Sequence, residues 1–168
     1  MRLYLDNAAT TPISKEVLET MISSLADFGN SESKFYEETE KAKTNIKKAR
    51  QEIAKSVGCL ENEVVFTSGA TEANNLVIKG LAASYPNKKK IIISAIEHSS
   101  INGPCAYLES IGYEIKKIKV NKNGLIDIDE LKNEIDDSTL LVSIIWVNNE
   151  VGTIQQIDAI DEICYQHG

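Results

Sequence analysis

Short apolar runs alternate with longer amphipathic segments along the chain, and this alternation predicts strands followed by helices. The runs that predict strands are residues 63–66, 91–95, 113–120 and 139–147. The last run is the longest and almost continuously apolar, which predicts a strand buried on both faces of a sheet. Apolar residues recur at helical spacing near 14–25, 32–57, 73–81, 100–111, 127–135 and 157–166. Together the elements predict an α/β fold, a mainly parallel sheet with flanking helices and right-handed crossovers.

The first residues differ from the rest of the chain. Small side chains and Pro12 predict an extended arm, and Ser14 is placed to start the first helix. The positions that follow contain no repeat and no low-complexity linker. We therefore expect an N-terminal arm over residues 1–13 and one domain over residues 14–168.

Composition narrows the possible functions. The 168 residues are 42% hydrophobic and 26% charged, as is usual for a soluble globular domain. A net charge of −7 argues against a nucleic-acid binder, and no apolar run is long enough to span a membrane. The three cysteines form no C-x-x-C pair. They predict reduced thiols that pack as small hydrophobes in a cytoplasmic protein, and they offer no metal site.

The strongest candidate for a binding site is the run of small residues Ser68, Gly69, Ala70 and Thr71. It lies between the predicted strand 63–66 and a predicted helix, so it forms a strand-to-helix turn. Backbone N–H groups and the helix dipole at such a turn suit a phosphate or a carboxylate. The alternative is that Ser68 or Thr71 caps the helix and Gly69 only permits the turn.

Two further motifs follow predicted strands. Glu97 and His98 come after the strand 91–95, and the segment 148–150 comes after the strand 139–147. Ligands of parallel α/β sheets collect at the carboxyl ends of strands, so the three motifs are candidates for one shared site. Taken alone, His98 can equally be a helix cap, and Asn149 a turn residue in the left-handed conformation.

Four motifs in one order resemble a known family. They are residues 4–12 (YLDNAATTP), 66–72 (FTSGATE), 97–98 (EH) and 147–152 (VNNEVG). They are similar to the cysteine desulfurases of the NifS/IscS type, class-V aminotransferase-like enzymes of fold type I that depend on pyridoxal 5′-phosphate. The resemblance extends along the whole chain and implies that residues 14–168 are an incomplete large domain that binds this cofactor.

The resemblance implies a role for four residues. The backbone of Ala70 and the hydroxyl of Thr71 match the groups that hold the cofactor phosphate. His98 matches the imidazole that stacks on the pyridine ring and shuttles protons, a task that suits histidine. Asn149 matches the amide that donates a hydrogen bond to the phenolic oxygen.

The resemblance also implies the reaction and the partners. Members of the family convert L-cysteine to L-alanine and transfer the sulfur as a protein persulfide to acceptor or scaffold proteins. They work as homodimers and supply iron–sulfur cluster assembly or thiolation pathways. The cofactor supplies the organic chemistry, and the protein orients it.

Some residues of the family are not matched in these 168 positions. They are the aspartate that pairs with the pyridinium nitrogen, the lysine that binds the cofactor, and the nucleophilic cysteine. We therefore expect the isolated chain to be inactive and to represent the N-terminal part of the enzyme. The missing lysine, with departures from the family at Ser31 and Phe35, leaves an alternative, a truncated non-catalytic paralogue that acts as a binding or assembly module. Another class-V aminotransferase, or a selenocysteine lyase, is the third possibility.

Overall fold

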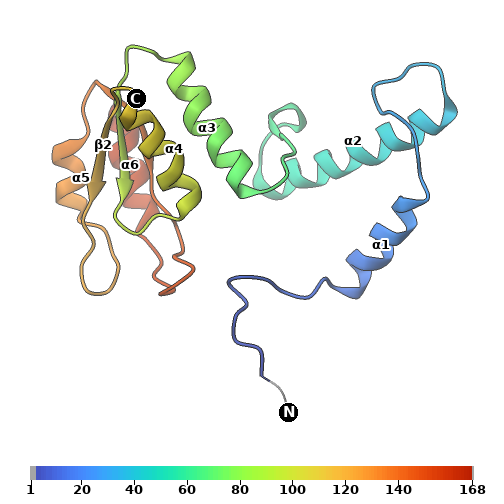
Figure 1. Ribbon diagram of the computed structural model, residues 1–168, viewed down its shortest axis with the longest axis horizontal. Coiled ribbons are helices and arrows are strands. Elements are labelled where there is room, and N and C mark those ends of the chain that lie inside the picture. Colours follow the sequence, from blue (N-terminus) through green and yellow to red (C-terminus); the bar gives the residue numbers. More distant parts are fainter. Residues whose placement is uncertain (1–2, 168) are drawn as a thin grey trace. The chain divides into compact units, whose positions relative to one another are not determined.

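The computed structural model describes residues 3–167, and these fall into two compact units. Figure 1 shows the course of the chain through both. Unit 1 ends at Phe66 and unit 2 begins at Thr67. The chain therefore passes from one unit to the other directly before the turn at 68–71.

Unit 1 is helical. It contains α1 (Lys15–Leu25), α2 (Glu37–Val57) and the short 3-10 helix η1 (Glu61–Glu63). The Ser14 hydroxyl accepts a hydrogen bond from the Val17 N–H at 3.3 Å and caps α1, as its position predicts. Gly58 ends α2 with φ of 73°, a left-handed conformation that glycine adopts without a steric penalty. The helix expected from residue 32 starts five residues later, because a turn from Asn30 to Ser33 precedes it.

The apolar faces of the unit 1 helices are exposed. α1 contains no buried residue, and α2 buries only Thr39 and Ala54. The helical spacing of Ile46, Ile53 and Val57 predicts a buried face on α2, and this prediction is wrong because all three are exposed. The helical period indicates which side of a helix is apolar, but burial also requires a surface that covers it.

Unit 2 has the predicted α/β architecture. Its three parallel strands lie in the order β2-β1-β3, and four helices accompany them (Figure 1). The strands are β1 (Lys90–Ser94), β2 (Glu114–Ile118) and β3 (Thr139–Ser143). The helices are α3 (Ala70–Ser84), α4 (Ser99–Ser110), α5 (Ile128–Glu134) and α6 (Ile157–His167).

The core of unit 2 lies on both faces of β1. Ile91 and Ile93 pack in one cluster with residues of α3 and α4, while Ile92 packs in a second cluster with residues of α5 and α6. Successive side chains of a strand point to opposite faces, so a continuous apolar run is what a strand covered on both sides requires. All five residues of β1 are buried.

One strand prediction is wrong, and another is correct only over part of its length. Residues 64–67 form no strand; instead the Arg50 guanidinium donates a hydrogen bond to the Val64 carbonyl and lies 4.9 Å from the centre of the Phe66 ring. The long run 139–147 forms a strand only over β3, at an edge of the sheet, where each residue is half-buried. Residues of β3 pack against the clusters on both faces, but an edge strand has only one neighbouring strand, so its other side stays open within the described structure.

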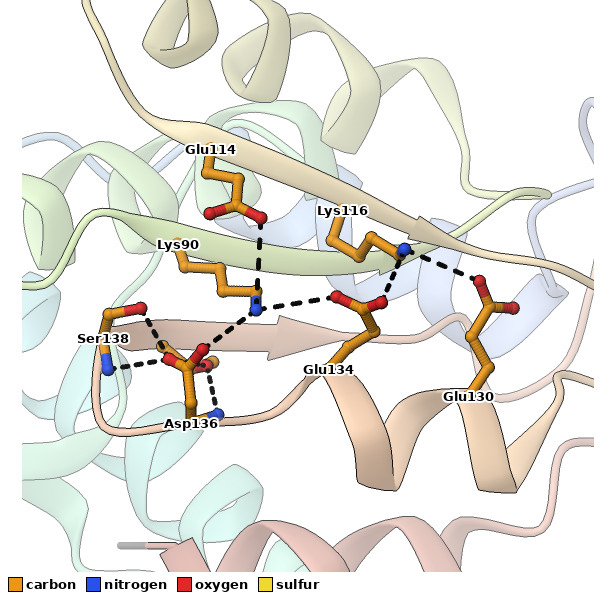
Figure 2. Close-up of polar contacts among 8 residues, drawn as sticks. Lys90, Glu114, Lys116, Glu130, Glu134, Asp136 and Ser138 are labelled. Atoms are coloured by element: carbon orange, nitrogen blue, oxygen red, sulfur yellow. Dashed lines mark hydrogen bonds and ion pairs between the residues drawn. The ribbon is translucent and has the colours of Figure 1, made fainter.

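A cluster of charged residues lies at the amino end of the sheet (Figure 2). The side chain of Lys90 at the start of β1 is only 8% exposed, and its Nζ lies 3.0 Å from Asp136 and 3.6 Å from Glu134. Lys116 of β2 binds Glu134 at 2.7 Å. Burial lowers the pKa of Lys90, but the hydrogen bond and charge of Asp136, together with the charges of Glu114 and Glu134, outweigh that effect and hold the pKa above its ordinary value.

We expect stability to fall in acid because of Asp136. Hydrogen bonds from the Ser138 hydroxyl, and then from Lys90, lower the pKa of Asp136 from 3.8 to about 2. A carboxyl whose pKa is lower in the folded state stabilises the fold above its unfolded pKa. This contribution is therefore complete above about pH 4 and is lost as the pH falls towards 2.

Urea denaturation at a series of pH values tests this. Asp136→Asn should be less stable than the parent chain at neutral pH, and the difference should shrink below pH 4. Asp137→Asn is the matched control, because Asp137 is exposed and lies outside the cluster. A constant difference between parent and Asp136→Asn across the pH range would contradict the assignment.

Candidate functional site

The turn before α3 leaves backbone N–H groups at the helix start without a side-chain cap. Gly69 is the N-cap residue, and neither Ser68 nor Thr71 takes that role. The alternative that one of these hydroxyls caps the helix is therefore wrong. Ala70 and Thr71 are the first two residues of α3, and both are exposed. An anion can reach their N–H groups, and the helix dipole favours it there.

Glu72 is already an anion at this helix start. Its carboxylate accepts a hydrogen bond from the Ser68 N–H at 2.6 Å. This bond, followed by one from the Ser68 hydroxyl, lowers the pKa of Glu72 below its ordinary value. Glu72 therefore occupies the N–H group of Ser68, while the helix start at Ala70 and Thr71, both exposed residues, has no side-chain cap.

His98 caps α4. Its Nδ1 accepts a hydrogen bond from the Ser100 N–H at 3.1 Å and lies 2.9 Å from the Ser100 hydroxyl. That hydroxyl in turn accepts a hydrogen bond from the Asn74 side-chain amide of α3 at 2.8 Å. The interpretation of His98 as a helix cap is confirmed, and the imidazole remains exposed. The contacts join Asn74, the fifth residue of α3, to the first turn of α4.

Two side chains tie the loops after β1 and β3 together. The Glu97 carboxylate accepts hydrogen bonds from the Ser94 hydroxyl and from the Ile145 N–H, each at 2.6 Å. The Asn148 amide donates to the Ile96 carbonyl at 3.1 Å. Asn148 is 5% exposed, so its amide is a buried link between the two loops.

Asn149 lies at the tip of a narrow loop. Val147 and Ile154 form an antiparallel bridge at the base, and the Asn148 side-chain oxygen accepts the N–H groups of Glu150 and Val151. The Asn149 amide is exposed and donates to Glu150 at 2.7 Å. Among residues 3–167 only glycines have positive φ, so the left-handed conformation considered for Asn149 is wrong.

The loop is also held from its far side. The buried Gln155 side chain accepts the Ile126 N–H at 3.1 Å and donates to the Gly124 carbonyl at 2.7 Å. A Cβ on Gly124, whose φ is 78°, would lie 2.7 Å from the Thr153 hydroxyl. The backbone on both sides of Asn149 is therefore fixed by contacts that do not involve Asn149.

The structure brings the three motifs to one end of unit 2 through these links. Asn74 connects the turn at 68–71 to His98, and Asn148 connects the loop that holds Asn149 to the segment directly before His98. No direct hydrogen bond among Thr71, His98 and Asn149 occurs in the described part of the chain. An open pocket of about 260 Å³ lies between α3 and α4 and includes Thr71 and Ser100 in its lining.

Sequence reasoning missed Asn74, Ser100, and the structural role of Glu97. Each acts through a partner on another element, and Asn74 and Ser100 are 26 positions apart. The sequence signals were present but weak: polar residues at Asn74 and Ser100 near the starts of helices, and a carboxylate next to His98.

We expect Glu97→Ala to lower the free energy of unfolding by about 3 kcal/mol, because each hydrogen bond to a charged group contributes roughly 1.5–3 kcal/mol. Urea denaturation followed by fluorescence of the single tryptophan, Trp146, measures this. The control is Glu109→Ala on the exposed side of α4, which should change stability by no more than about 0.5 kcal/mol. Equal effects of the two substitutions would contradict the role of Glu97.

Cys105 and Cys164 pack with the core of unit 2 as predicted, whereas Cys59 belongs to neither core cluster. All three are free, and Cys105 is 1% exposed in the core of unit 2. Burial raises the pKa of the Cys105 and Cys164 thiols. Residues 3–167 contain no group of side chains suited to hold a metal ion. Over the same residues, none of the helices is both long and apolar enough to cross a membrane.

Comparison with known proteins gives consistent matches along the chain. The family described as Aminotransferase class-V matches residues 3–168. The cysteine desulfurase IscS of Buchnera aphidicola subsp. Acyrthosiphon pisum (strain 5A) is 45% identical over 170 residues, covering 99% of this chain and 42% of that protein. The cysteine desulfurase IscS of Methanosarcina thermophila is 46% identical over 167 residues, covering 98% of this chain and 41% of that protein.

Solved structures agree on the fold. A NifS-like protein superposes with a TM-score of 0.96 at 36% identity, covering all of this chain and 46% of its own. SspA in complex with cysteine gives a TM-score of 0.90 at 41% identity, covering 95% of this chain and 46% of its own. The chain thus spans less than half the length of these relatives. From the family match and these similarities, the chain belongs to the class-V aminotransferase family, and it resembles the NifS/IscS-type cysteine desulfurases along almost its entire length.

Proposed function

We propose that this chain is part of the cofactor-binding domain of a cysteine desulfurase that depends on pyridoxal 5′-phosphate. The observation that carries the proposal is the 45% identity to a cysteine desulfurase over 99% of the chain. In this proposal residues 14–168 belong to the cofactor-binding domain, and residues 1–13 are an N-terminal arm. The full protein would convert L-cysteine to L-alanine and transfer the sulfur as a persulfide.

The start of α3 suits the cofactor phosphate. Its first N–H groups have no side-chain cap, and Gly69 has no heavy atom within 4 Å of the position that a Cβ would take. A phosphate could therefore approach the N–H of Ala70 closely, and the Thr71 hydroxyl could donate a further hydrogen bond. The helix dipole adds partial positive charge at the same point.

His98 and Asn149 suit the cofactor ring. The His98 imidazole is exposed and fixed by its cap contact, so it can present a flat face for stacking. The exposed Asn149 amide can donate a hydrogen bond to the phenolic oxygen. When bound, pyridoxal 5′-phosphate supplies the electron sink for the chemistry, while these residues would orient it and move protons.

The substrate and partners follow from the same resemblance. L-cysteine is the proposed substrate, and a related solved structure is described as a complex with cysteine. We further propose a cytoplasmic homodimer that delivers sulfur to acceptor or scaffold proteins of iron–sulfur cluster assembly or thiolation. Pull-down of persulfide-labelled acceptors from a lysate of the source cells would test this last step.

A substrate assay of the full protein tests the reaction. With pyridoxal 5′-phosphate and L-cysteine, we expect alanine and an equal amount of transferable sulfur. Alanine from L-selenocysteine but not from L-cysteine would instead assign a selenocysteine lyase. Absence of alanine from both substrates, with the cofactor bound, would overturn the proposal.

We expect Thr71→Ala in the full protein to weaken binding of pyridoxal 5′-phosphate about tenfold or more, since a hydrogen bond to a charged group contributes roughly 1.5–3 kcal/mol. Pyridoxal, which lacks the phosphate, should bind both variants equally. Ser110→Ala at the far end of α4 is a control with a similar loss of one hydroxyl. A Thr71→Ala effect of the same size on pyridoxal would show that the threonine does not act on the phosphate.

A further inference from the structure

The contacts around His98 determine which ring nitrogen carries the proton. Nδ1 accepts a hydrogen bond from the backbone N–H of Ser100 at 3.1 Å. A backbone N–H can only donate, so Nδ1 must provide a lone pair. A neutral imidazole carries one proton on its two nitrogens, and that proton is therefore on Nε2.

Ser100 and Asn74 strengthen this preference. The Asn74 amide donates to the Ser100 hydroxyl oxygen at 2.8 Å, which leaves the hydroxyl proton free to point at Nδ1, 2.9 Å away. Nδ1 then receives two donors from one residue. Ser100 is 6% exposed, so water has little access to replace either contact. The partial positive charge at the start of α4 also opposes a proton on Nδ1.

We propose that Asn74 and Ser100 are positioning residues that hold His98 in the Nε2–H tautomer, with Nδ1 occupied by its contacts to Ser100. The role of this tautomer in catalysis rests on the proposed function, whereas the NMR test of the tautomer itself does not. Ser100 contacts the ring through its N–H and its hydroxyl, and Asn74 acts on the ring through that hydroxyl; no hydrogen bond to Nε2 occurs in the described structure.

The tautomer sets how His98 can move a proton. Neutral His98 can donate a hydrogen bond from Nε2 but has no lone pair there. A proton taken up by the ring must bind Nδ1, which displaces the Ser100 N–H from it. If the imidazolium then releases the Nε2 proton, the remaining proton is on Nδ1 and must leave again before the Nε2–H tautomer and the bond from the Ser100 N–H are restored. Protonation of His98 is thus coupled to loss of the cap of α4.

Nitrogen NMR of the histidines tests the inference without cofactor or turnover. The chain has two histidines, so ¹⁵N-histidine labelling gives few signals, and His167→Gln assigns them. Solid-state measurement serves equally where the chain self-associates. In the neutral ring of His98, we expect Nδ1 at the shift of an unprotonated nitrogen and Nε2 at that of a protonated one. A protonated Nδ1 would overturn the proposal.

Variants test the two positioning residues. Ser100→Ala and Asn74→Ala should each move the His98 Nδ1 shift part of the way towards the average of exchanging tautomers, because the hydroxyl donor is lost or misdirected and only the Ser100 N–H still favours a lone pair on Nδ1. Ser100→Thr, which keeps a hydroxyl, should restore the parent shift. Ser99→Ala is the matched control, since the exposed Ser99 is outside this chain of contacts. Parent-like shifts in both alanine variants would overturn the role of Asn74 and Ser100, whether or not the full protein desulfurates cysteine.

Discussion

Replacing His98 by Asn should lower turnover of the full protein by about two to four decades, the usual contribution of a positioned acid–base group. Asn is chosen because it is among the best N-cap residues and can replace the bond from the Ser100 N–H that caps α4. The variant thus removes the imidazole while keeping the helix start. Cofactor content should remain high, because the groups proposed to bind the cofactor phosphate belong to Ala70 and Thr71 on α3.

His98→Ala provides the comparison. It should lose the same activity and, in addition, about 1 kcal/mol of stability from the missing cap. Three measurements separate the possible effects. Single-turnover alanine formation reports the chemical step, absorbance reports the bound cofactor, and urea denaturation reports stability. Near-parent turnover of His98→Asn would remove His98 from the catalytic residues and leave it as a helix cap alone.

A preparation of these 168 residues should form no alanine from cysteine and no stable covalent bond between a lysine and pyridoxal 5′-phosphate. Such a bond needs a desolvated amine aimed at the aldehyde. The buried lysine of unit 2, Lys90, is held by Asp136 and Glu134 at the amino end of β1, whereas the candidate site lies at the carboxyl ends of the strands. Lys79 shares a pocket with Thr71, but it is exposed.

The cysteines lead to the same expectation. Attack on the substrate sulfur requires a thiolate, and burial raises the pKa of Cys105 and Cys164. The test is borohydride reduction in the presence of pyridoxal 5′-phosphate, followed by peptide mapping and an alanine assay. Stoichiometric labelling of one lysine together with alanine formation would contradict the prediction. Trace labelling spread over exposed lysines would agree with it.

The sequence predicted the fold because its strongest signals are local. The apolar run at β1 requires a strand covered on both sides, and the caps Ser14, Asp127 and Gly58 mark helix ends within a few positions. The prediction of strands from the sequence failed at residues 63–66 and 144–147. There, β-branched residues indicate a strand, but pairing depends on a neighbouring strand that a local pattern does not specify.

The candidate site was predictable in part. The turn at 68–71, His98 and Asn149 stand out because each follows an apolar run and belongs to a motif. The links that hold them were not predictable, because a hydrogen bond such as that of Glu97 to the Ile145 N–H depends on how two strands lie side by side. Motifs therefore indicate the reacting groups, whereas the three-dimensional structure is needed to find the residues that position them.

In the loop that holds Asn149, the residues that shape the backbone differ from the residue exposed at the tip, and this has an evolutionary consequence. Asn148 and Gln155 are buried and bear the contacts that shape the loop, while Asn149 is exposed and bonds only to its neighbour Glu150 within the described structure. Substitution at position 149 therefore carries little penalty in folding. Selection can change the residue offered to a ligand there without first compensating for lost stability, so this position is free to diverge between lineages whose chemistry differs.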